Sequence, residues 1–322
     1  MHPVGYHEAR QSWCCLLPTL VLACVAGCVP ADQALPLGSA EFTVTGRASP
    51  RLFVGGEQVV DGWSIRIDRF VVSFKTMTIV NLLNSDQCAY RGRGAASNVV
   101  FEATEGSVVQ AFNGIKPGAC PDVGMRLGAP DDRTVLGEGA TVADLVALAT
   151  GQPALALVEA TATFEPSSGD TSSGDAPPVK PMHISMRFDA LTTSAAFGGC
   201  RDASKGARIR PESRYALFVS FALENLFRDA ISATASLRFA PFALADSQYG
   251  NKDGIVTMDE IDKVPLALIP FEVPLFGSQF YQLPDGTTHG SFGDYLRKQF
   301  QFSLKFGNGG QCNGIDPGTE GL

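Results

Sequence analysis

Polar and apolar residues alternate along much of this chain, which is the pattern of β-strands with one buried face. The longest such stretch covers residues 62–83. Apolar side chains hold the odd positions from 63 to 67 and the even positions from 70 to 74. Because a slip of one residue moves every later side chain to the opposite face of a sheet, we predict a bulge or bend at Arg69.

Shorter alternating segments recur towards the C-terminus. They are separated by turn-forming residues, and we predict strands at 155–164, 182–188, 215–223, 237–242 and 300–306. One segment has a helical pattern instead, because Thr141 can cap its start, Asp144 occupies the third position and Gly151 follows its end. We therefore expect a mainly β fold, an antiparallel β-sandwich or barrel-like structure with one or two short helices.

The composition agrees with this fold class. Charged residues are 18% of the 322 residues, below the usual share of about 25%, whereas Gly and Pro exceed theirs. The net charge of −8 argues against nucleic acid as a partner. Residues 166–181 contain Ser-Ser-Gly-Asp twice and few apolar side chains, so we predict a disordered loop within one β domain covering 41–322, with an interdomain linker as the alternative.

An apolar run near the start of the chain indicates export. Residues 13–25 are largely apolar but too few to cross a bilayer, which takes about 20 residues. The sequence Val-Ala-Gly-Cys at 25–28 resembles the lipobox of bacterial lipoproteins. The resemblance implies that 1–27 is a signal peptide, that Cys28 carries a diacylglycerol and that 28–40 is a tether. A freely secreted protein and an uncleaved anchor are the alternatives.

The lipobox resemblance also implies a location, since lipid on Cys28 would hold the protein in the cell envelope. Val29 is not the aspartate that retains some lipoproteins in the inner membrane, so the outer membrane is favoured. In an oxidising compartment, two disulfides are expected among the four remaining cysteines, which are Cys88, Cys120, Cys200 and Cys312. Three pairings are open, and we favour Cys88–Cys120 with Cys200–Cys312, because each bridge would staple loops of one half.

Residues 251–260 resemble the second part of an EF-hand or dockerin-type calcium loop. Gly254 supplies the sharp turn of such a loop, and Thr257 with Glu260 forms a capping box for a following helix. The resemblance implies a structural calcium site within 246–260. Its expected ligands are Asp246, Asn251, Asp253, the carbonyl of Ile255, and Glu260.

This loop departs from the standard pattern in two ways. The first ligand position falls on Tyr249, which has no carboxylate, so Asp246 can replace it only if the loop carries an insertion. A preceding helix is not expected either, because 237–243 follows a strand pattern. The alternative is an acidic turn before a capped helix, with no ion bound.

No catalytic residues are predicted. His183 and His289 are the histidines that remain after removal of the signal peptide, and they lie in separate segments. Ser291, two residues after His289, lies in a glycine-rich stretch that resembles a nucleophile elbow only faintly, because His289 replaces the leading glycine. An enzyme is therefore disfavoured, and a serine hydrolase is the last of three hypotheses.

The favoured hypothesis is a lipid-anchored cell-envelope protein with a structural or binding role. Its partners would be the membrane, through lipid on Cys28, and an envelope protein or a glycan. The alternative is a carbohydrate- or ligand-binding module on the cell surface. That module would need exposed aromatic side chains, and the candidates are Trp63, Tyr281 and Tyr295.

Overall fold

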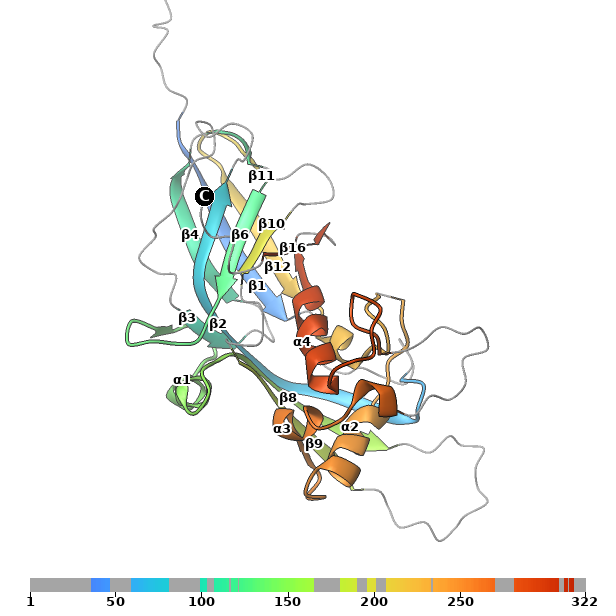
Figure 1. Cartoon of the computed structure of the whole chain (residues 1–322). Helices are drawn as coiled ribbons and strands as arrows, with labels where there is room; N and C mark the ends of the chain where they lie inside the picture. The colour runs from blue at the N-terminus through green and yellow to red at the C-terminus, as the bar shows by residue number, and fades with distance from the viewer. Residues whose placement is uncertain are drawn as a thin grey trace, which may run out of the picture. The chain divides into compact units, whose positions relative to one another are not determined.

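The structure of this protein is a computed structural model (Figure 1). It describes residues 36–46, 59–80, 99–102, 107–115, 117–120, 122–164, 180–189, 196–200, 207–232, 234–269, 281–306, 310–311 and 313–315. The chain divides into two compact units, Met1–Ala34 and Leu35–Leu322, and all described residues belong to the second. The predicted signal peptide, Cys28, Cys88, Cys312 and most of the loop 166–181 lie outside the described residues.

The described residues are rich in strands, which confirms the mainly β prediction. A nine-stranded sheet has the order β13-β9-β8-β2-β6-β10-β16, with β3 beside β2 and β7 beside β3. Its strands are β2 (Trp63–Val80), β3 (Val99–Glu102), β6 (Asp122–Leu127), β7 (Val135–Leu136), β8 (Ala154–Phe164), β9 (Met182–Asp189), β10 (Ala196–Cys200), β13 (Ile255–Thr257) and β16 (Asn313–Ile315).

A five-stranded sheet has the order β15-β14-β12-β1-β4, and β5 pairs with β11 in a separate ribbon. The bounds are β1 (Gly38–Gly46), β4 (Ser107–Ile115), β5 (Gly118–Cys120), β11 (Ala207–Ile209), β12 (Arg214–Phe221), β14 (Leu304–Phe306) and β15 (Gly310–Gln311). β1 lies between β12, to which it is parallel, and β4, to which it is antiparallel. Pairs β9–β13 and β3–β7 are also parallel, so the sheets are mixed rather than purely antiparallel, and the described strands do not close either one.

The predicted irregularity at Arg69 is confirmed. The register of β2 against β8 shifts between Ile67 and Arg69, so Asp68 is an extra residue in β2. The bulge keeps both apolar series of β2 inside, because Ile65 and Ile67 before it and Phe70, Val72 and Phe74 after it are all buried.

The predicted helix at 141–150 is confirmed as α1 (Val142–Ala149). Thr141 and Asp144 form its capping box, and Asp144 Oδ2 also accepts a hydrogen bond of 2.5 Å from the Arg69 guanidinium of β2. The buried Leu148 of α1 belongs to a small second hydrophobic cluster with Val71, Val100, Ala154 and Leu157. Since Val71 alternates with core residues Phe70 and Val72, α1 covers the opposite face of the sheet from the main core.

Asp144 makes the attachment of α1 pH-dependent. Burial alone would raise the pKa of Asp144, but hydrogen bonds from Thr141 and the Arg69 guanidinium outweigh burial and hold that pKa below its ordinary value. The stabilisation is therefore complete above about pH 4, the pKa of an unfolded Asp, and is lost as the pH falls through the folded value. We expect Asp144→Asn to cost about 1 kcal/mol at neutral pH and to weaken the acid dependence of thermal melts. Equal acid sensitivity in both proteins would contradict this role.

Two predicted strands near the C-terminus are wrong. Residues 240–244 form α2 (Ala240–Leu244), and most of 300–306 belongs to α4 (Phe292–Ser303), so only β14 remains strand. Pro241 occupies the first turn of α2, where proline suits a helix. Ser291 and Asp294 form a capping box for α4, and its buried residues recur at helical spacing. The other helices are η1 (Leu223–Phe227), the π-helix η2 (Ala245–Tyr249), α3 (Met258–Ile261) and η3 (Leu266–Leu268).

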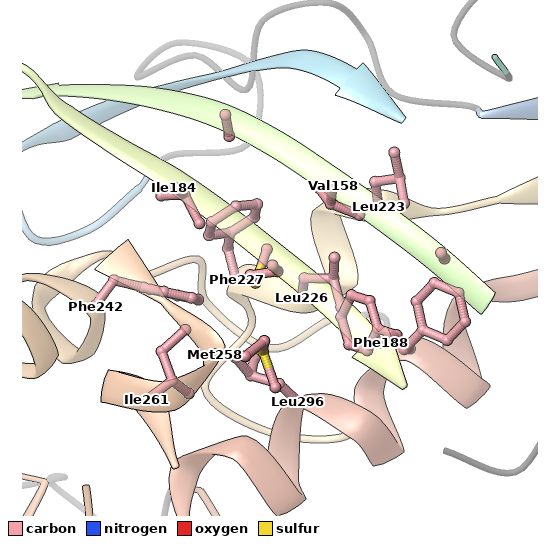
Figure 2. Close-up of a cluster of buried hydrophobic side chains, with 14 of the residues drawn as sticks. Val158, Ile184, Phe188, Leu223, Leu226, Phe227, Phe242, Met258, Ile261 and Leu296 are labelled. Atoms are coloured by element: carbon pink, nitrogen blue, oxygen red, sulfur yellow. The ribbon is translucent and has the colours of Figure 1, made fainter. Parts of the chain in front are cut away.

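The helices bury one face of β8 and β9 (Figure 2). Val158 of β8 and Ile184 and Phe188 of β9 share the main core with residues from η1, α2, α3 and α4. The labelled helical members are Leu223, Leu226, Phe227, Phe242, Met258, Ile261 and Leu296. This packing fixes α2 and α3, and therefore the segment between them, against the edge of the nine-stranded sheet.

Candidate cation site

The predicted calcium loop lies between two helical segments. α2 runs directly into η2, and the loop then leads through β13 into α3. A helix therefore does precede the loop, contrary to the sequence-based expectation. The apolar residues of 237–243 suggested a strand, but Phe239 and Phe242 are three residues apart, a spacing that places them on one face of a helix. Both are fully buried and stack on each other with ring centroids 5.5 Å apart.

The loop is attached to the sheet by backbone pairing. β13 extends the nine-stranded sheet by pairing in parallel with β9, and Ile255 lies opposite His183. The His183 N–H donates a 2.8 Å hydrogen bond to the carbonyl of Gly254. Gly254 has a φ of +82°, as the predicted sharp turn requires. The loop is therefore held at the edge of the sheet as well as by its helices.

Glu260 caps the helix that follows the loop, as predicted. Its Oε2 accepts hydrogen bonds from the backbone N–H of Thr257, at 2.9 Å, and from the Thr257 hydroxyl, at 3.2 Å. Its Oε1 accepts one from the backbone N–H of Asn251, at 3.1 Å. The side chain is buried, so this carboxylate joins both ends of the loop.

Asn251 and Asp253 bind each other. The Asn251 amide donates to Asp253 Oδ2 at 2.8 Å, and the Asp253 N–H donates to Asn251 Oδ1 at 3.1 Å. Asp253 Oδ1 accepts a third bond, from the Ile255 N–H, at 2.8 Å. Both side chains are exposed. These bonds shape the turn, and they use one lone pair of each side-chain oxygen that was predicted to bind calcium.

Asp246 differs from the other acidic residues of the segment. It lies in η2, its residue is 6% exposed, and its Oδ1 is buried without a hydrogen-bond donor. Gly250 lies between Asp246 and Glu260. A Cβ added to Gly250 would overlap the Glu260 carboxylate and would lie 3.0 Å from Asp246 Cα. The structure thus brings Asp246 and Glu260 together around Gly250 and places Asn251 with Asp253 on the outer side of the turn.

The available donors are carboxylate, amide and carbonyl oxygens, which suit Ca²⁺ or Mg²⁺ rather than soft metals. Only two of these carboxylates, those of Asp246 and Glu260, are buried. Within the ranges that the structure describes, no group of three or more His, Cys, Asp or Glu side chains is placed to hold a metal ion. The residues therefore fit a site completed by water or backbone oxygens, not a cage of side chains.

The residues predicted as candidates for catalysis or for ligand binding serve the fold instead. Ser291 accepts the Asp294 N–H at 3.1 Å and donates to Asp294 Oδ2 at 3.0 Å, as the cap of α4. Trp63, Tyr281 and Tyr295 are 8%, 3% and 0% exposed, so these aromatic rings belong to the core and cannot form a surface platform. Among the predicted disulfide cysteines, Cys120 lies at the end of β5 and Cys200 at the end of β10.

Comparisons with known proteins found no match among family models, curated proteins or solved structures. None of the helices in the described ranges combines the length and apolar character needed to cross a membrane.

Proposed function

We propose that this chain is a lipid-anchored protein of the bacterial cell envelope, with a structural or binding role, and that the outer membrane is its location. The observation that carries the proposal is the lipobox-like sequence at 25–28. β1 begins at Gly38, so the last three residues of the predicted tether 28–40 belong to this strand and nine residues, 29–37, separate it from Cys28.

Replacing the lipidated cysteine is expected to release the protein. Cys28→Ser removes the acceptor thiol, and a chain without its acyl groups loses the burial that holds it in a bilayer. We expect the variant to move from the membrane fraction to the soluble fraction, and mass spectrometry of the wild type to show an acylated Cys28 peptide. Cys24→Ser, inside the signal peptide, is the control and should stay membrane-bound. Membrane association of Cys28→Ser equal to that of the wild type would refute lipid anchoring.

We propose two further details of the body. The first is a structural calcium ion at 246–260, supported by the helices on both sides of the loop and by its oxygen donors. Identical melting with and without chelator would count against it.

The second is a sandwich arrangement of the sheets, supported by Phe70 of β2 and Phe221 of β12, whose ring centroids are 5.0 Å apart. These residues come from the nine-stranded and five-stranded sheets.

A polar row on the nine-stranded sheet favours a ligand-binding module as the second candidate. Arg66, Thr161 and His183 lie opposite one another on β2, β8 and β9. Asp68 accepts 2.5 Å bonds from Arg66 Nε and from the Thr161 hydroxyl. Because Thr161 uses its proton on Asp68, its hydroxyl oxygen can accept a hydrogen bond from His183 Nδ1, 3.3 Å away.

This row presents fixed donors and acceptors on an exposed face, as recognition of a polyhydroxylated ligand requires. We expect His183→Ala and Arg66→Ala to lower binding on a glycan array at least 10-fold without changing the melting temperature by more than about 2 °C. Glu138→Ala, an exposed residue outside the row, is the control. An array on which the wild type binds no glycan would remove this candidate.

A further inference from the structure

The π-helix η2 supplies part of the insertion that the loop needs. A π-helical turn holds more residues than an α-turn and arises where an extra residue enters a helix. Here it spans Ala245–Tyr249, directly before the loop, and contains Asp246. In the standard register the first ligand would be Tyr249, which offers no carboxylate. Asp246 and Glu260 are the buried acidic residues of this segment, and the Cα of Asp246 and the carboxylate of Glu260 both adjoin Gly250.

A count of lone pairs shows which oxygens are free to bind an ion. Each carboxylate oxygen can accept about two hydrogen bonds. Glu260 Oε2 already accepts two, from Thr257, whereas Oε1 accepts one, from Asn251. Oε1 is also the atom that adjoins Gly250. Asp246 Oδ1 accepts none although it is buried. One oxygen of each carboxylate is therefore open, and Glu260 can bind an ion without giving up its role as helix cap.

Asn251 and Asp253, the outer residues of the loop, form hydrogen bonds with each other. Each Asp253 oxygen and the Asn251 amide oxygen accept one hydrogen bond, so these oxygens are distinguished from Glu260 Oε1 by their exposure and not by the lone-pair count. Both residues are exposed, so an ion bound there would gain little over an ion in water. Their interactions account for the turn without any ion.

We infer that a hard divalent cation binds between Asp246 Oδ1 and Glu260 Oε1, each carboxylate contributing one oxygen, with water completing the shell and with Asn251 and Asp253 outside it. This inference rests on the proposed cation site and changes its ligand set. Ca²⁺ in an EF-hand draws its affinity from many protein oxygens and a bidentate Glu, whereas Mg²⁺ keeps several waters and uses one or two carboxylates. The site therefore lacks a strong preference for Ca²⁺ over Mg²⁺.

The test is calorimetric titration and thermal melting of the full chain in detergent, after chelator treatment, with CaCl₂ and MgCl₂ in separate arms. We expect each ion, at about 100 times its Kd, to raise the melting temperature by about 5 °C. Asp246→Asn, which keeps the size of the side chain, should lower affinity at least 10-fold. Asp253→Asn is the matched control in the same loop and should keep affinity within about 3-fold. Circular dichroism of both variants checks that they fold.

The outcomes separate the inference from the proposed site. If neither ion shifts the melting of the wild type, the proposed cation site fails and the inference with it. If Asp253→Asn abolishes binding while Asp246→Asn retains it, the loop binds calcium in the standard register and only the inference fails. Binding of Ca²⁺ more than about 100-fold tighter than Mg²⁺ would also overturn the two-oxygen arrangement.

Discussion

Truncating Phe300 to alanine is expected to destabilise the folded protein by about 3–5 kcal/mol, the range for removal of a buried aromatic ring. Phe300 on α4 is fully buried and stacks on Phe188 of β9, with ring centroids 4.3 Å apart, and on Phe221 of β12, at 5.7 Å. One ring thus joins a helix to strands of two different sheets, and a cavity there would loosen all three. Urea unfolding followed by fluorescence measures the loss.

Phe302→Ala is the matched control for this prediction. Phe302 lies two residues further along α4, but its side chain is on the exposed face of the helix. The same truncation there should cost less than about 1 kcal/mol, because an exposed ring loses little on replacement. Similar losses in the two variants would mean that the ring at 300 does not link the sheets as described.

Arg297→Ala is expected to cost about 3 kcal/mol. The Arg297 guanidinium forms two hydrogen bonds with Asp262, at 2.8 and 2.7 Å, and lies 3.8 Å from Asp189. Its removal leaves Asp189, whose side chain is 12% exposed, without this counter-charge. We place the cost at the low end of the range for breaking a buried ion pair, because the Asp262 side chain is partly solvated. Thermal and urea unfolding measure it.

Two variants on α4 distinguish the ion pair from a general effect on the helix. Lys298→Ala removes the neighbouring exposed charge and should change stability by no more than about 0.5 kcal/mol. Gly293→Ala should destabilise, because a Cβ at this position would overlap Asp262 Oδ1 and disturb the same pair. Unfolding of Arg297→Ala and Lys298→Ala at the same urea concentration would show that Arg297 does not stabilise the fold.

The parts of the fold that the sequence predicted correctly have strong local signals. The phase change around Arg69 required a bulge, and the register of β2 contains one at that point. Thr141, Asp144 and Gly151 bounded α1, and the capping box forms as expected. In each case neighbouring residues alone determine the structure, so no knowledge of distant contacts was needed.

The errors arose where two periodicities compete. Phe300, Phe302, Leu304 and Phe306 alternate, but the buried positions of α4 are Phe292, Tyr295, Leu296, Gln299, Phe300 and Ser303, which follow a helical repeat. Ser291 with Asp294 was the available signal for the start of this helix. The parallel pairing of β1 with β12 joins residues far apart in the chain, and no local pattern predicts it.

The candidate site was predicted in part. Gly254 and the capping box of Thr257 and Glu260 follow from residue types, and both are present. The burial of Asp246 depends on the π-helical geometry of η2, which has no reliable sequence signature. The mutual bonds of Asn251 and Asp253 could not be predicted either, because both residue types serve equally as calcium ligands and as turn formers.

The position of β1 has a mechanical consequence. If Cys28 is held in a bilayer, any drag on the body is transmitted through nine residues directly into β1. That strand is paired along its length with β12 on one side and β4 on the other. A pull directed along the strand would load the two ladders in shear, so that they would rupture together instead of opening one bond at a time. Anchoring at Cys28 would therefore load the body at a strand that is paired on both sides.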